Sequence, residues 1–207
     1  MNDEVSTPTW ALMIGSHRAG SASNLVAQQL IQRLETIAPA VRVEAIDLAA
    51  ARLPFWGEPS EEGAGSSSAW APISRTLEAA EALIAVVPEW HGMVPAAVKN
   101  LFLYLSDELA HKPGLIVSIS ATQGGAYPVA ELRLSSYKNS RICWIPEHLI
   151  VRGCKAGDAN ATQRALAAID ERIDHALRLL GHYAHALRGV RQGMIGAGHP
   201  LFVAFGM

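Results

Sequence analysis

A short polar loop follows the first apolar run of the sequence and contains the residue types that bind phosphate. Residues 10–14 are apolar, and residues 15–24 then combine one guanidinium, that of Arg18, with the polar side chains of Ser16, Ser21, Ser23 and Asn24. Unpaired amides and a partial positive charge at a helix N-terminus favour a phosphate, and arginine suits its oxygens. We therefore expect phosphate binding here, although Ser23 or Asn24 capping the helix is the simpler alternative.

Two common nucleotide-binding patterns are absent from this loop. It has no GxxxxGK[ST] motif, so it lacks the lysine of a P-loop ATPase. It also has no GxGxxG motif, which disfavours a dinucleotide site of the Rossmann type.

A second unusual loop, residues 88–95, has the composition of a binding site for a flat ring. Two prolines stiffen the loop, a glycine permits close approach of the backbone, and a tryptophan offers a flat apolar surface. The candidate contacts are Pro88, Glu89, Trp90, His91 and Gly92. Taken alone, the tryptophan also fits ordinary packing at a sheet edge or an oligomer interface, and the histidine fits an exposed loop.

A third loop, residues 120–126, contains paired glycines that free the backbone to approach a ligand or to turn tightly. Its candidate ligand contacts are Thr122, Gln123, Gly124 and Gly125. Without the other two loops, a plain tight turn would be the better interpretation.

The elements that must position these loops alternate between strand and helix. Apolar or alternating runs predict strands at 10–14, 41–46, 83–87, 114–119 and 142–151. Helical spacing predicts helices at 24–37, 69–82, 94–109, 126–139 and 161–187, with a surface loop at 57–68.

This alternation indicates an α/β fold, with one five-stranded parallel sheet covered by helices on both faces. We expect one domain over residues 1–207, with 1–8 flexible and 189–207 as a C-terminal extension. In such sheets, ligands bind beyond the carboxyl ends of the strands, where the strand order reverses. The three loops are predicted to meet there.

The composition of the chain excludes several other roles. The 207 residues are 50% hydrophobic and 17% charged, with a net charge of −2, which fits a globular domain and gives no basic surface for nucleic acid. Cys143 and Cys154 form no close pair, and no zinc-like spacing appears, so no metal is expected. No secretory signal or membrane-length apolar run is present, and we expect a cytoplasmic protein.

The three loops resemble, in the expected order, the motifs of the NADPH-dependent FMN reductase family. Residues 15–21 (GSHRAGS) resemble its GSxRxxS phosphate loop. Residues 88–91 (PEWH), with Pro95 and the pair Lys99-Asn100, resemble its PEYN…PxxLKN segment. Residues 122–125 (TQGG) resemble its [ST]xGG loop, and the whole resemblance spans roughly residues 10–155.

The resemblance implies a flavodoxin-like three-layer sandwich that binds FMN noncovalently. It assigns the FMN phosphate to Ser16, Arg18, Ser21 and Ser23, and the isoalloxazine ring to residues 88–91 and 122–125. It also implies a homodimer or homotetramer with active sites near subunit interfaces. The sequence departs from the family at Trp90, where tyrosine is usual, and at His91, where asparagine is usual.

The activity implied is an FMN-dependent oxidoreductase. NADPH or NADH, as co-substrate, would pass a hydride to the flavin, and a quinone, free flavin or other small acceptor would then take the electrons. No catalytic acid or base is assigned. Two alternatives stay open at this point: a non-enzymatic FMN-binding electron carrier or redox-responsive module, and a phosphate-binding hydrolase or transferase.

Overall fold

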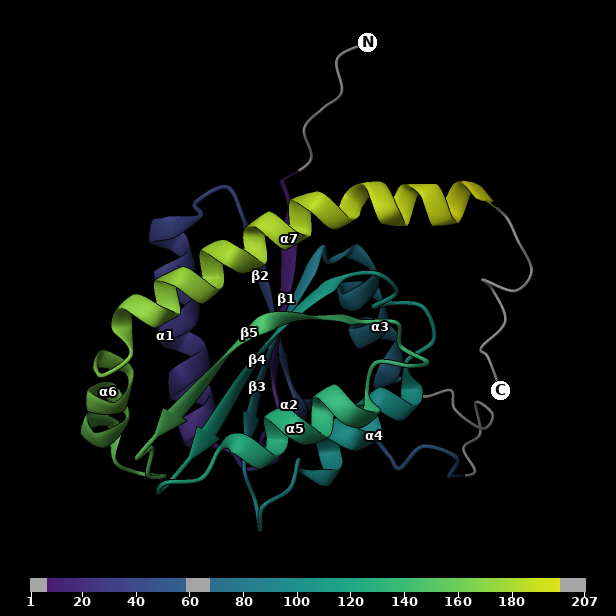
Figure 1. Ribbon diagram of the computed structural model, residues 1–207. Coiled ribbons are helices and arrows are strands. Elements are labelled where there is room, and N and C mark those ends of the chain that lie inside the picture. The colour runs from purple at the N-terminus through teal and green to yellow at the C-terminus, as the bar shows by residue number, and fades with distance from the viewer. Residues whose placement is uncertain (1–6, 59–67, 198–207) are drawn as a thin grey trace.

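A computed structural model describes residues 7–58 and 68–197 (Figure 1). Most of the loop expected at 57–68, the start of the chain and residues 198–207 lie outside the described residues. Five parallel strands form one sheet in the order β2-β1-β3-β4-β5. They are β1 (Thr9–Ile14), β2 (Arg42–Asp47), β3 (Ala82–Pro88), β4 (Pro113–Ser120) and β5 (Cys143–Arg152).

Helices cover both faces of the sheet, as the alternation predicts. On one face lie α1 (Ala22–Ile37), α6 (Ala159–Ala167) and α7 (Asp170–Ala197). On the other lie α2 (Leu48–Ala51), α3 (Trp70–Ala79), α4 (Ala96–Tyr104) and α5 (Ala126–Ser135). The expected flavodoxin-like three-layer arrangement is confirmed, because the strand order is the one in which β1 and β3 flank the reversal of direction.

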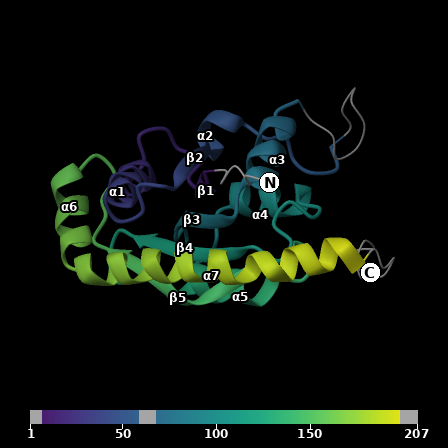
Figure 2. The ribbon, with the colours of Figure 1, turned by 90° about the horizontal axis from the view of Figure 1, so that it is seen from above.

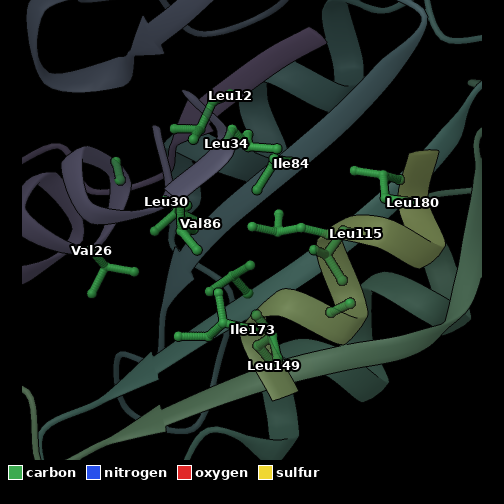
Figure 3. Packing of buried hydrophobic residues seen from close by; sticks show 14 of the residues in the cluster. Leu12, Val26, Leu30, Leu34, Ile84, Val86, Leu115, Leu149, Ile173 and Leu180 are labelled. Atoms are coloured by element: carbon green, nitrogen blue, oxygen red, sulfur yellow. The ribbon is translucent and has the colours of Figure 1, made fainter. Parts of the chain in front are cut away.

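Continuous apolar strands form the middle of the molecule because both of their faces are covered. Every residue of β3 and β4 is buried. Side chains that alternate along each strand enter opposite cores, so Ile84 and Val86 pack toward α1 and α7, whereas Ala85 and Val87 pack toward α3 and α4. Figure 3 shows the first of these cores, where Leu30 and Leu34 of α1 meet Leu12 and Ile84 of the sheet.

The single helix predicted at 161–187 is wrong, because two helices occupy this region. α6 ends at Ala167, and α7 begins at Asp170 and continues to Ala197, running along the molecule from α6 (Figure 2). No glycine or proline marks the break. The cause is tertiary packing, since α6 packs mainly on α1 whereas α7 crosses β4 and β5.

Three other helices end earlier than predicted. The helix predicted at 69–82 ends at Ala79, and those predicted at 94–109 and 126–139 end at Tyr104 and Ser135, where side chains stabilise the turns that follow. After α4, the Glu108 carboxylate accepts hydrogen bonds from the Ser106 amide at 2.6 Å and the Ser74 hydroxyl at 2.9 Å. After α5, the Ser136 hydroxyl donates to the Leu132 carbonyl at 2.5 Å and accepts from the Trp144 indole at 2.9 Å. Serine hydroxyls that bond to nearby backbone compete with helix formation.

Pro146 lies within β5 but does not end it. The pairing of β4 with β5 shifts register between Gly114 and Ile116, whose partners are Trp144 and His148. Residues 145–147 therefore form an irregularity on the outermost strand, where Pro146 is exposed. An edge strand tolerates a proline at such a point because no ladder hydrogen bond is lost.

Lys112, just before β4, is a nearly buried cation with a structural role. Its ammonium donates hydrogen bonds of 2.7 Å to the carbonyls of Leu77 and Glu78, at the C-terminal end of α3, where cations are favoured. Burial is the main reason why the pKa of Lys112 falls from 10.5 to about 8, and Arg191 lowers it further. Glu78, Glu108 and Glu81 oppose this shift.

The lowered pKa predicts a pH-dependent stability. Between about pH 8 and 10.5 the folded protein has lost the Lys112 proton while the unfolded chain retains it, so stability rises with pH in this window. Urea unfolding from pH 7 to 10 should show wild type gaining stability relative to Lys112→Met, by at most about 1.4 kcal/mol per pH unit. Unfolding free energies that stay parallel across this range would contradict the prediction.

Candidate FMN site at the carboxyl edge of the sheet

The strand order brings the three candidate loops to one edge of the sheet. β1 and β3 are neighbours, and β4 lies beside β3, so the loops that follow them are adjacent at the carboxyl edge. The reversal of strand order lies between β1 and β3.

Gly15 fixes how closely the first loop lies against β3. Its amide donates to the Val86 carbonyl at 2.8 Å. A Cβ at this position would lie 2.7 Å from Cγ2 of Val98 in α4 and 2.9 Å from the Val86 carbonyl oxygen. Only glycine fits there, because neither the strand backbone nor the packed valine has room to move.

The first loop presents an uncapped helix N-terminus. Ser21 occupies the N-cap position of α1, but its side chain makes no capping hydrogen bond. Instead its hydroxyl donates to Asn24 Oδ1 at 2.7 Å, and the Asn24 amide donates to Asp47 at the end of β2 at 3.2 Å. The expected alternative, helix capping by Ser23 or Asn24, is wrong, since the N-cap residue is Ser21 and no side chain caps it.

The other two hydroxyls of the loop are buried. Ser16 is 1% exposed, and its oxygen accepts a hydrogen bond from the Arg18 amide at 3.1 Å. Ser23, in the first turn of α1, is also 1% exposed. Hydrogen bonds within the loop thus stabilise its conformation, and no side chain caps the amides at the start of α1.

Arg18 joins the first loop to the second. The central carbon of its guanidinium lies 4.4 Å from the centre of the Trp90 ring, a cation–π contact. His17 packs edge-on against the same indole, with ring centroids 4.5 Å apart and planes at 86°. Sequence reasoning anticipated that the loops of Arg18 and Trp90 would meet, but not that His17 would pack against the same indole.

The second loop is a tight turn whose two central residues are left-handed. His91 has φ of 50° and Gly92 has φ of 72°. The amides of Trp90 and Met93 each donate to the carbonyl of the other, at 3.1 and 3.0 Å. Both features define a type I′ turn, and histidine, like asparagine, is among the residues that tolerate its first position. The departure at His91 therefore leaves the backbone conformation available.

Glu89 connects the second loop to the third. One carboxylate oxygen accepts a hydrogen bond from the Gly125 amide at 2.6 Å. The other lies where a side chain on Gly124 would be, 2.3 Å from the position of a Cβ. Gly125 is itself left-handed, with φ of 103°, so the glycine pair is required both by the carboxylate and by the turn.

The remaining candidates lie around these contacts. Pro88 is the buried last residue of β3, whereas His91, Thr122 and Gln123 are exposed at the rim. The structure thus brings all three loops together, and Glu89 connects the second loop to the third.

Several supporting residues were missed by sequence reasoning. Arg152, at the end of β5, donates from Nε to the carbonyls of Gln123 and Gly124, both at 2.9 Å. Glu131 in α5 accepts from the Val94 amide at 2.8 Å and pairs with Lys99 at 2.6 Å. The signal for Arg152 was its place at the end of the last strand; no local motif marks Glu131.

Asn100, a residue of the second motif, proves to bind protein backbone. Its side chain donates to the Pro54 carbonyl at 2.7 Å and accepts from the Trp56 amide at 2.8 Å. The Tyr104 hydroxyl donates to the same Pro54 carbonyl at 3.2 Å. The asparagine of this motif therefore holds the segment after α2 against α4.

These features fit the phosphate of FMN. The donor set combines an uncapped helix start, buried serine hydroxyls and an exposed arginine, all hydrogen-bond donors to a dianion. The turn after β3 leaves its backbone accessible. Among the described residues, the atom that a Cβ on Gly92 would meet within 4 Å is Cδ2 of Tyr127, at 3.8 Å.

The sequence profile of one protein family, described as NADPH-dependent FMN reductase, matches residues 8–154. The match covers all five strands and the three loops. The chain belongs to this family. It is therefore an NAD(P)H-dependent flavin oxidoreductase with FMN as cofactor, and the sequence-based expectation of this enzyme class is confirmed. The hydrolase or transferase alternative has no support in this match.

The chain is also similar to a curated protein and to several solved structures. An NADPH azoreductase from Bacillus sp. (strain OY1-2) is 23% identical over 158 residues, covering 76% of this chain and 84% of that protein. An oxidoreductase from Corynebacterium diphtheriae superposes with a TM-score of 0.65 at 15% identity, covering 88% of this chain and 98% of that one.

A third protein shares the fold. The NAD(P)H:quinone oxidoreductase of Methanothermobacter marburgensis has a TM-score of 0.60 at 14% identity, with coverage of 82% of this chain and 98% of that one. At these identities the solved structures bear on the fold alone.

The connection made by Glu89 predicts a loss of stability when it is removed. Glu89→Ala leaves the Gly125 amide without its charged acceptor, so the free energy of unfolding at pH 7 should fall by about 1.5–3 kcal/mol in urea titrations. Glu35→Ala, on the exposed face of α1, is the control and should change little. Equal stabilities for the two variants would show that the carboxylate does not hold the third loop.

Proposed function

We propose that the FMN-dependent enzyme passes electrons from NAD(P)H to a quinone, a free flavin or another small acceptor. The observation that supports this proposal is that the three loops meet where the strand order reverses. The cation–π contact of Arg18 with Trp90 joins the first loop to the second, and the hydrogen bond from the Gly125 amide to Glu89 joins the second to the third. The whole chain acts as one FMN-binding unit in this proposal.

The residues of the three loops would divide the work of holding the cofactor. Ser16, Arg18, Ser21, Ser23 and the first amides of α1 bind the phosphate. The type I′ turn and the Gly124-Gly125 pair present backbone at the ring, while Trp90 holds Arg18 in place through the cation–π contact. When bound, FMN supplies the hydride and electron transfer; the protein supplies orientation and electrostatics.

We also propose that two or more copies associate through a surface beside this site. We define the α4–α5 surface by exposed apolar side chains on these helices and adjoining loops. They are Phe55, Trp56, Met93, Leu103, Tyr127, Leu134 and Tyr137. Exposed fractions of 50% for Met93 to 81% for Leu134 leave a large apolar area in water, which is typical of an interaction site. Met93 and Tyr127 place this surface next to the candidate FMN site.

The proposed location is the cytoplasm. Both cysteines are free thiols, which fits a reducing compartment. Among the described residues, no helix has the length and apolar character needed to span a bilayer.

The cofactor and its reduction are tested by absorption spectroscopy. Protein purified and mixed with FMN should show a flavin band that bleaches on anaerobic addition of NADPH and returns with a quinone. A protein that binds FMN but is not bleached by NADPH or NADH would point to the electron-carrier alternative.

Removing Arg18 should weaken FMN binding. Arg18→Ala loses a charged hydrogen-bond donor, so the FMN dissociation constant from fluorescence titration should rise by a factor equivalent to about 1.5–3 kcal/mol. Arg75→Ala, which removes an exposed arginine from α3, is the matched control. Unchanged affinity in Arg18→Ala would contradict the assigned phosphate role.

The assembly is tested by placing a charge on the α4–α5 surface. Leu134→Glu should shift the molar mass in light scattering toward the monomer, because the carboxylate would be buried without a partner. Val190→Glu alters another exposed apolar residue, on α7, and should leave the mass unchanged. A monomeric wild type at micromolar concentration would overturn the proposal.

A further inference from the structure

A cavity lies at the opposite edge of the sheet from the three loops. Its volume is about 310 Å³, and its walls include Pro8, Val41 and Glu81, which precede β1, β2 and β3. α7 forms the facing wall and passes over the start of β1 (Figure 1). The volume is near the lower end of the range for small-molecule sites. This cavity takes no part in the proposed FMN site.

The floor of the cavity is apolar. Trp10 and Leu177 line it and are 3% and 1% exposed, so both side chains are fixed by the core around them. Ile37, Ala38 and Val41 complete the apolar wall. A cavity with such walls suits a hydrocarbon body.

Gly181 of α7 also lines the cavity and lies against the edge of the indole. It lies in the interior of α7, a helix of 28 residues, where glycine is among the least favourable residues. A Cβ at this position would lie 3.6 Å from Cη2 and 3.7 Å from Cζ2 of Trp10, which is ordinary van der Waals contact. An alanine would therefore fit against the indole, and a longer side chain would extend past it into the cavity that Gly181 lines.

The rim of the cavity is basic. Arg178, His182 and His185 follow helical spacing on one face of α7 and line the cavity. Within residues 7–58 and 68–197, no hydrogen bond or ion pair engages these three side chains. The acidic wall residue, Glu81, is already bound by Arg188 through two hydrogen bonds of 2.9 and 2.6 Å. The side chains available to a ligand are therefore the imidazoles of His182 and His185, as hydrogen-bond donors, and the guanidinium of Arg178.

We propose that this cavity binds a small amphiphilic carboxylate. Its apolar body lies in the cavity beside Gly181, against Ile37, Ala38 and Val41, and its carboxylate accepts hydrogen bonds from Arg178 and the imidazoles beside it. The apolar floor accounts for the body of the ligand, and the unpaired arginine accounts for its charge.

The test uses 1-naphthoate as the probe and the full chain loaded with FMN. Isothermal titration calorimetry should detect binding to wild type, and Arg178→Gln should weaken it about tenfold by removing the charged donor. Arg164→Gln, an exposed arginine of α6, is the matched control and should bind as wild type does. The neutral analogue 1-naphthylmethanol should bind more weakly and should not respond to Arg178→Gln.

The cavity beside Gly181 is tested by filling it. Gly181→Leu should abolish naphthoate binding and leave NAD(P)H oxidation unchanged. Gly189→Leu places the same side chain on α7 where nothing lies within 4 Å, and should keep the affinity. Gly181→Ala should raise the melting temperature, since alanine is the better helix former, and should weaken binding.

Three results would overturn the proposal: no binding of naphthoate to wild type, binding that persists in Gly181→Leu, or equal affinity for the acid and the alcohol. Persistence in Gly181→Leu would place the probe elsewhere, for instance at the flavin.

Discussion

Burial of the central strands on both faces is the constraint from which the rest of the structure follows. β3 and β4 contribute only buried residues, and β1 differs from them only at Thr9. Polar chemistry is therefore excluded from the sheet and confined to its two edges. The carboxyl edge receives the loops that begin the helices, with their unpaired amides. The amino edge receives the helix ends and the strand beginnings.

The loops at the carboxyl edge are connected mainly by charged side chains. The Arg18 guanidinium lies on the Trp90 ring, and the Glu89 carboxylate accepts a hydrogen bond from the Gly125 amide. Arg152 donates to the carbonyls of Gln123 and Gly124. Each contact joins loops that follow different strands, so the loops depend on one another for their conformation. Charged hydrogen bonds of this kind are stronger than neutral ones and preorganise a site before its ligand arrives.

The order of strands and helices was readable from the sequence because buried parallel strands give continuous apolar runs. Residues 83–87 and 114–119 have no other simple interpretation. The division between α6 and α7 was not readable, because the break depends on what each helix packs against. Near the site, the motifs marked Arg18 and Trp90, but their contact with each other depends on the adjacency of β1 and β3. Glu131 and Asn100 act through partners 37 and 46 residues away, which local patterns cannot show.

The absence of a side chain at Gly15 has a consequence for how the enzyme family can vary. β1, β3 and α4 meet at this point with no free volume, so the distance between the loop after β1 and the turn after β3 is set by backbone contact. Changes in the exposed residues of either loop, such as histidine for asparagine at position 91, alter the surface of the loop while the backbone frame stays constant. A larger residue at position 15 would instead push α4 from the sheet and widen the gap between the two loops, so catalysis would fail while much of the fold persisted.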